Sequence, residues 1–433
     1  MLCCNVPAGI RKVADRFKSV FEGSSASYSA LTALFCLHLY GCKGLSDLVR
    51  LFPGSPSVSA LSRAVRAFNG NRFMRRMNHR TLRHFAGKLN ADDFCYAVDD
   101  TDNPKYGDLY RCGNWHGSKG PYHGRKVLVL ALVDRKRGVA IPIQYEFARK
   151  KGEPDYKSMV DLAIELLDDC IHAGFPKLPV TCDSWFDSAD LMNALTKRGL
   201  VFAGEIKSTR LVRPGAGPNV PRRKLKAFFT GALRVLVLAR PNGEPAGKKL
   251  RRGPKKRKAM AEAVLMINGV SHPVKVIAVY NKRKTTEAFA YYLSTDRSMS
   301  GAKLWALSRS RWAIEVLFRD LKQHLSFGRL PCAGKEAADL AVCMPFALIA
   351  SLRLDDSAQW GLPKDEVMSI GEKVSRIREN GFEKSLQLII NNPEHHNVKS
   401  LRQRRRIDRL KRKPVQETAA ERRHRKLQEA QAA

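Results

Sequence analysis

Between residues 94 and 206, short apolar runs alternate with amphipathic segments in an order that few folds can accommodate. The predicted elements are strands at 94–98, 127–133 and 139–147, a helix at 156–172, a strand at 179–182, a helix at 188–198 and a strand at 201–206. Three strands in a meander, followed by alternating helices and strands, predict a mixed sheet flanked by helices. The sequence therefore indicates an α/β fold.

The segments on both sides of this region differ from it in their pattern of apolar and charged residues. We expect a helical, DNA-binding region at 1–90, the first part of the α/β core at 91–206, a β-rich insertion at 207–300, the closing core helices at 301–355 and a basic helical tail at 356–433. Within the closing helices, the pattern predicts one long helix at 303–325 and another at 335–355, which Pro345 would kink.

The charge of the chain indicates a polyanionic partner. Lys and Arg number 77 against 41 Asp and Glu, a formal net charge of +36. The run 248–258 holds eight basic residues in eleven, and the tail 399–433 holds thirteen basic residues against four acidic ones. These two segments carry +17, which leaves +19 on the rest of the chain. Such a distributed surplus favours nucleic acid as the partner and argues against a small-metabolite enzyme.

Neither a membrane span nor a disulfide framework is predicted. The most apolar stretch, 28–42, is 15 residues long and contains His38, whereas a span needs about 20 apolar residues. No secretion signal precedes it. The ten cysteines are scattered and form no Cys-x-x-Cys pair, which is typical of reduced thiols. We expect a cytoplasmic, DNA-associated protein with no membrane partner.

Acidic residues occur where an α/β sheet usually places its chemistry. Asp99 and Asp100 follow the first predicted strand, Asp183 follows the fourth, and Glu315 lies in a later helix. Cleavage of a phosphodiester by two divalent ions needs about three such acids from distant elements. Arg311 and Lys322 share the helix face of Glu315. Taken alone, however, the Arg311–Glu315 spacing is that of an ordinary surface ion pair.

The tryptophans beside these acids are expected to be structural. Trp185 comes two residues after Asp183, and a tryptophan in this position is more often part of a core than a stacking platform. Trp312 follows Arg311 and is expected to pack against the sheet.

Together these residues resemble a known family. The pattern Arg-x3-Glu-x6-Lys at Arg311, Glu315 and Lys322, preceded by Asp99-Asp100-Thr101 and by Asp183-Ser184-Trp185-Phe186, looks like the DDE transposases of bacterial insertion sequences. The most similar branch has an RNase H-like core, a β-rich insertion before the final Glu and a Tyr-x2-Arg-x3-Glu-x6-Lys signature. The resemblance covers roughly 94–330.

The resemblance implies roles for individual residues. Asp99, Asp183 and Glu315 would be the catalytic ligands of two Mg²⁺ (or Mn²⁺) ions. Arg311 and Lys322 would contact DNA phosphates beside the scissile bond. We also expect DNA contacts from the loop that follows the first strand, through three lysines: Lys105, Lys119 and Lys126.

The match departs from the family pattern in two ways. Ser308 stands where the signature has Tyr, so a hydroxyl is kept without an aromatic ring. Asp99 and Asp100 are adjacent, and successive strand residues face opposite sides, so only one of them is expected to point into the site. We choose Asp99 because the Asp-x-Thr pattern fits related polynucleotidyl-transferase folds.

The expected function is a DNA transposase that hydrolyses phosphodiester bonds at transposon ends and transfers strands into target DNA. Its expected partners are terminal inverted repeats and target DNA, bound by a homodimer. Two alternatives stay open: a nuclease or resolvase on the same core, and a non-catalytic DNA-binding protein.

Overall fold

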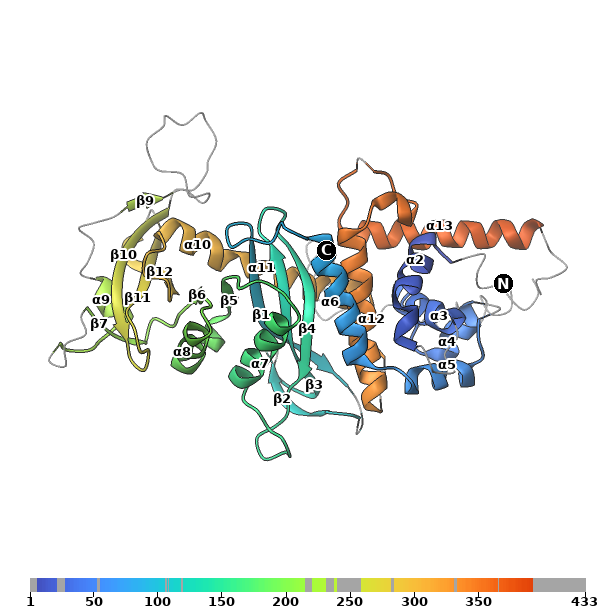
Figure 1. The fold of residues 1–433 in the computed structure, drawn as a ribbon, viewed down its shortest axis with the longest axis horizontal. Helices are drawn as coiled ribbons and strands as arrows, with labels where there is room; N and C mark the ends of the chain where they lie inside the picture. Colours follow the sequence, from blue (N-terminus) through green and yellow to red (C-terminus); the bar gives the residue numbers. More distant parts are fainter. Residues whose placement is uncertain are drawn as a thin grey trace, which may run out of the picture. The chain divides into compact units, whose positions relative to one another are not determined.

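The computed structural model of the 433-residue chain describes residues 6–21, 28–52, 55–105, 107, 109–117, 120–214, 220–230, 237–239, 258–281, 284–330, 333–364 and 366–391. Contacts divide the chain into two units, Met1–Ile377 and Arg378–Ala433. Helix α13 (Ile370–Asn391) crosses that boundary. All other described elements belong to the first unit (Figure 1). The basic tail at 399–433 and residues 248–257 of the basic run lie outside the described residues.

The first sheet has the predicted mixed topology. Its strands are β1 (Phe94–Pro104), β2 (Gly113–Gly117), β3 (Gly120–Asp134), β4 (Val139–Phe147) and β5 (Val180–Cys182). They follow the order β2-β3-β1-β5, with β4 also on β3. Strands β1, β3 and β4 form the antiparallel meander, and β5 runs parallel to β1. This arrangement is that of an RNase H-like core, so the predicted fold class is confirmed.

Strand β1 extends further than its apolar run indicated. Pairing with β3 continues from Phe94 to Pro104, so Asp99 and Asp100 lie inside the strand rather than after it. The region rich in Gly and His, expected as a loop, is instead the β2–β3 hairpin, in which Gly113 pairs with Gly124 and Gly117 with Gly120. Its side chains alternate between half-buried and exposed. A strand without a buried apolar face lacks the alternation by which a strand is recognised.

The predicted β-rich insertion is a second, antiparallel sheet. Its strands are β6 (Ala203–Glu205), β7 (Leu211–Arg213), β8 (Arg223–Lys224), β9 (Val237–Ala239), β10 (Lys258–Ile267), β11 (Val274–Asn281) and β12 (Lys284–Ser294), with the short helix α9 (Leu225–Thr230). Their order is β6-β12-β11-β10-β7-β8, and β9 pairs with β10. Strand β6, expected in the first sheet, pairs antiparallel with β12. Phe202, directly before it, forms a parallel bridge to Val180 of β5, so this segment joins the two sheets.

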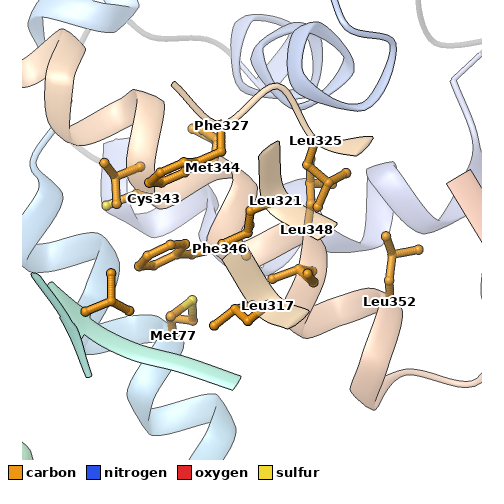
Figure 2. Close-up of a cluster of buried hydrophobic side chains, with 14 of the residues drawn as sticks. Met77, Leu317, Leu321, Leu325, Phe327, Cys343, Met344, Phe346, Leu348 and Leu352 are labelled. Carbon is orange, nitrogen blue, oxygen red and sulfur yellow. The ribbon is translucent and has the colours of Figure 1, made fainter. Parts of the chain in front are cut away.

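Helices pack around these sheets. They are α2 (Ala8–Phe17), η1 (Lys18–Phe21), α3 (Tyr28–Leu39), α4 (Leu45–Leu51), α5 (Val58–Arg66), α6 (Gly70–His84), α7 (Met159–His172), η2 (Ser184–Phe186), α8 (Ala189–Lys197), α10 (Gly301–Ser310), α11 (Trp312–His324), α12 (Lys335–Leu354) and η3 (Ser357–Trp360). One apolar cluster takes side chains from α2, α3, α6, α11 and α12. Figure 2 shows part of it, with Met77 of α6 near Leu317 of α11 and Phe346 of α12. The N-terminal helices therefore share a core with the helix that carries Glu315.

Helix α12 lies at the centre of this shared core. It is long and apolar enough to cross a membrane, with a mean hydropathy of 1.6, but 83% of that stretch is buried inside the fold. It is longer than the apolar stretch at 28–42 that stood out in the sequence. Pro345 lies within the continuous helix.

The buried His38 predicts an acid-sensitive contact between α3 and the end of α11. Its Nδ1 lies 3.3 Å from the carbonyl oxygen of Leu325, and its Nε2 has no hydrogen-bond partner among the described residues. Burial lowers the pKa of His38 to about 4.

Because the unfolded chain binds this proton near pH 6.5 and the folded chain only near pH 4, stability is lost as the pH falls between them. We expect the free energy of unfolding of the wild type to decrease relative to His38→Gln over this range, by about 3 kcal/mol in full. Urea titrations from pH 7 to pH 4.5 measure the difference. A difference between the two proteins that stays constant with pH would contradict the assignment.

Candidate active site

The register of β1 and β5 brings two of the predicted acids together. Val98 and Cys182 are partners in the parallel pair, so the next residues, Asp99 and Asp183, lie side by side and face the same side of the sheet. The carboxylate of Asp183 also accepts a hydrogen bond of 2.6 Å from the backbone N–H of Ser184 and so caps η2. This local cap fixes the acid at the carboxyl end of β5.

The third acid reaches this pair through Arg311. The single helix predicted at 303–325 is interrupted there: α10 ends at Ser310 and α11 begins at Trp312. At the break, the Arg311 N–H donates to the carbonyl of Ser308 at 3.3 Å, which is a tighter turn than an α-helix makes. From this turn the guanidinium donates to Asp99 Oδ2 at 3.3 Å and pairs with Glu315 Oε1 at 2.6 Å. One guanidinium thus bridges Asp99 and Glu315.

Asp99, and not Asp100, faces this cluster. Asp100 points to the opposite side of the strand, where its carboxylate lies 3.0 Å from Lys126 Nζ. Asp102, two residues on, is 3.6 Å from the same Lys126 and accepts a hydrogen bond of 2.6 Å from the Tyr122 hydroxyl. The two adjacent aspartates therefore belong to separate polar clusters.

Burial of the Asp99 carboxyl outweighs the compensation that Arg311 supplies. Burial raises the pKa of Asp99 to about 7, and the neighbouring Asp100 and Asp183 contribute to the rise, although Arg311 opposes it. Burial disfavours the charge of Arg311 as well, but Asp99, Glu315 and Asp183 outweigh this cost and raise its pKa. Three carboxylates thus lie around one guanidinium, an arrangement that favours further cations.

Glu205 is an acid of this cluster that the sequence analysis missed. Extending the parallel bridge from Val180 and Phe202 places Glu205 beside Asp183. Gly204 supports this register, because a Cβ there would lie 3.1 Å from the carbonyl oxygen of Cys182. Burial and the charge of Asp183 raise the pKa of Glu205, and Arg311 lowers it. An acid at the end of the predicted strand 201–206 was the available signal.

The carboxylate oxygens suit Mg²⁺ or Mn²⁺, with two acids for an ion rather than a full shell of protein ligands. Among the described residues, no three His, Cys, Asp or Glu side chains are placed to hold one ion together. Mg²⁺ usually takes one or two carboxylates and completes its shell with water and substrate phosphates. Asp99 with Asp183 forms one such pair. Asp99 with Glu315 forms a second, where the Arg311 guanidinium now lies.

Lys105 and Lys126, two of the lysines predicted to contact DNA, are bound by other groups of the protein. Lys105 is 6% exposed, and its Nζ donates to the backbone carbonyls of Gly328 at 2.6 Å and Leu330 at 2.5 Å. This burial does not favour the predicted DNA contact, because the lysine instead holds the segment after α11. Lys126 is engaged by Asp100 and Asp102. Lys322 is half-buried on α11, and Lys119 lies outside the described residues.

Three further residues near the acids also depart from expectation. Trp185 is 58% exposed and Trp312 is 61% exposed, so neither is the core residue that was predicted. Ser308, at the signature position of Tyr, is 6% exposed, and its hydroxyl has no hydrogen-bond partner among the described residues. In the sequence, the exposed ring of Trp185 thus comes two residues after Asp183, and that of Trp312 directly after Arg311. The hydroxyl of Ser308 does not reach the surface.

The raised pKa of Asp99 predicts a stabilising substitution. Unfolded, this carboxyl ionises near pH 3.8, and folded only near pH 7, so the folded state loses stability as the pH rises through this interval. We expect Asp99→Asn in EDTA to unfold at higher urea concentration at pH 8, with a gain of about 2–4 kcal/mol. The gain should vanish below about pH 4. If the variant is instead less stable at pH 8, the ion pair with Arg311 outweighs the burial of the charge.

Comparison with known proteins places the chain in a family. The family model described as "Transposase DDE domain" matches residues 95–350, which is more than half of the chain. No curated protein matches the sequence. A cryo-EM structure of a piggyBac transposase synaptic complex with hairpin DNA is similar at 12% identity and a TM-score of 0.44, over 91% of this chain and 78% of that one. The family match spans the strands and helices that carry Asp99, Asp183 and Glu315, and the chain belongs to the DDE-domain transposases.

Proposed function

We propose that the protein is a DNA transposase of an insertion sequence that hydrolyses phosphodiester bonds at the ends of its element and joins them to target DNA. The observation that carries the proposal is the joining of three distant acids. Asp99 and Asp183 are neighbours across β1 and β5, and Arg311 links Asp99 to Glu315. The family match to a DDE domain agrees with this site.

The proposed chemistry assigns a role to each side chain. Asp99, Asp183 and Glu315 would hold two Mg²⁺ or Mn²⁺ ions, which supply an activated nucleophile and neutralise the leaving oxygen when bound. Arg311, which now pairs with two of these acids, would turn to the scissile phosphate. Its planar fork suits two oxygens of a phosphate as well as it suits carboxylates. Lys322 lies further along α11 and would contact the adjacent backbone.

The proposed partners follow from the charge and from the reaction. The surplus of +36 suits a protein that holds both terminal inverted repeats and target DNA. Pairing two element ends requires two active sites, so we propose a homodimer on DNA, in the cytoplasm where the chromosome is accessible. The N-terminal helices and the basic tail would add DNA contacts.

Substitution of single acids tests the catalytic proposal. Asp183→Asn and Glu315→Gln should each lower the rate of metal-dependent cleavage of end-containing DNA by about 10³-fold, because they remove charge that stabilises the transition state. Both variants should still retard labelled DNA on a gel. Asp169→Asn, an exposed acid on α7, is the matched control and should keep full activity.

The outcome also separates the alternatives. Cleavage without joining to a supplied target plasmid would indicate a nuclease or resolvase. Binding without any metal-dependent cleavage by the wild type would indicate a DNA-binding protein.

Arg311 predicts a metal affinity that rises when it is removed. Its guanidinium lies between Asp99 and Glu315 and competes with a metal for them. We expect Arg311→Gln to bind Mn²⁺ about fivefold more tightly than the wild type in the absence of DNA, the equivalent of about 1 kcal/mol for an ion pair. Electron paramagnetic resonance of free Mn²⁺ measures this.

Arg309 provides the control for this measurement. It is exposed and packs over the ring of Trp305, so Arg309→Gln should leave the Mn²⁺ affinity unchanged. Weaker Mn²⁺ binding by Arg311→Gln would show that the guanidinium orders the acids instead of occupying their cation site.

A further inference from the structure

Helix α6 carries an uninterrupted cationic face. Its fifteen residues, Gly70–His84, include no Asp or Glu. The exposed side chains Arg72, Arg75, Arg76, His79 and Arg83 recur at steps of three and four and so share one side of the helix. The opposite side, with Phe73, Met74 and Met77, is buried in the shared apolar core. The core thus fixes which face of α6 is presented to solvent.

This face forms one wall of a groove. Two hollows adjoin along it and have Arg76 and His79 in common. The first is lined by Arg16, Phe17, Arg76, His79, Arg80 and Arg83. The second is lined by Ser19, Val20, Arg72, Arg75, Arg76 and His79. The end of α2 and η1 therefore form the opposite wall of a single groove.

Among the described residues, the positive charges at the groove outnumber the negative ones. Asp355 is the one carboxylate that the described residues bring to it, where it pairs with both Arg16 and Arg80. Arg75 and Arg83 have no ion pair among the described residues. Arg76 donates from Nε to the backbone carbonyl of Arg16 at 3.2 Å, which holds its guanidinium at the groove. One acid faces two arginines at the floor, and the rim adds Arg75 and Arg83 without an ion pair among the described residues, so the groove suits an anion.

The length of the face indicates which anion it suits. From position 72 to position 83 the helix rises about 16 Å, which is too long for a single small anion and matches several successive phosphates of a nucleic-acid strand. The groove lies on α6, α2 and η1, whereas the catalytic acids lie on β1, β5 and α11.

We propose that this groove binds the phosphate backbone of duplex DNA and holds the element at a place separate from the scissile bond. The proposal rests on the proposed function for the identity of the polyanion. Among the described residues that line it, the groove exposes no Phe, Tyr or Trp ring for base stacking, since Phe17 is buried. A row of arginines about 16 Å long suits contacts to successive phosphates, which fix the position of the duplex and carry no sequence information directly.

The salt dependence of DNA binding tests this surface. The double variant Arg75→Gln/Arg83→Gln removes two unpaired rim cations and should reduce the slope of log affinity against log salt by about 1.8. Fluorescence anisotropy with a labelled random-sequence duplex of about two helical turns measures it. The control variant Lys151→Gln/Lys197→Gln removes two exposed cations that have no ion pair among the described residues and lie outside α6, and it should keep the wild-type slope.

Further measurements keep the outcomes distinct. Unchanged unfolding midpoints would show that the variants fold, as expected for exposed residues. An unchanged slope in the groove variant, or an equal reduction in the control, would overturn the proposal. So would polyglutamate that competes for the groove as well as duplex DNA of equal charge. Asp183→Asn should bind with the wild-type slope; if it also cleaves normally, the proposed function fails while the groove assignment stands.

Discussion

The burial of several carboxylates in one place is the constraint to which the rest of the site responds. The parallel register of β1 and β5 places Asp99 beside Asp183, and Glu205 follows on the next segment. Burial and like charge raise the pKa of Asp99 to about 7. A fold holds such groups together only if other contacts stabilise the sheet and if a cation is near. Here the sheet is anchored by its buried apolar strands, and the cation is the guanidinium of Arg311.

The break between α10 and α11 determines where the guanidinium of Arg311 lies. A straight helix would carry Arg311 and Glu315 on one face, as an ordinary exposed pair. The tight turn at Arg311 brings the guanidinium within reach of Asp99 on the sheet while Glu315 stays bonded to it. Asp99 and Glu315 thus meet through a residue that is itself suited to bind phosphate, and the strand register adds Asp183.

Much of the architecture could be predicted because it depends on local pattern. The meander, the parallel β5 and the insertion all follow from apolar runs and breaks, and the acids were visible as polar residues next to apolar strands. Strand alternation predicted that only one of Asp99 and Asp100 faces the site, and the Asp-x-Thr pattern favoured Asp99; the structure places the two on opposite faces and Asp99 in the cluster. The DDE-transposase resemblance rested on residues 94–330, and the family match covers 95–350.

What could not be predicted depends on tertiary contacts. Nothing in the local sequence distinguishes the buried Lys105, whose ammonium bonds to carbonyls more than two hundred residues away, from a lysine that faces DNA. The exposure of Trp185 and Trp312 depends on how η2 and α11 meet the sheet. Glu205 was visible as an acid near the end of a predicted strand, but its place beside Asp183 depends on the bridge between Phe202 and Val180.

The shared core of the N-terminal helices and α12 limits how this protein can be rearranged. Side chains of α2, α3 and α6 fill the same apolar cluster as those of α11 and α12. Removing the residues before β1 would expose the apolar side chains on one side of α12 to water. The N-terminal helices therefore cannot be exchanged by recombination without loss of the core that they share with α11 and α12. A lineage that acquired a new N-terminal segment would have to remodel α12 at the same time.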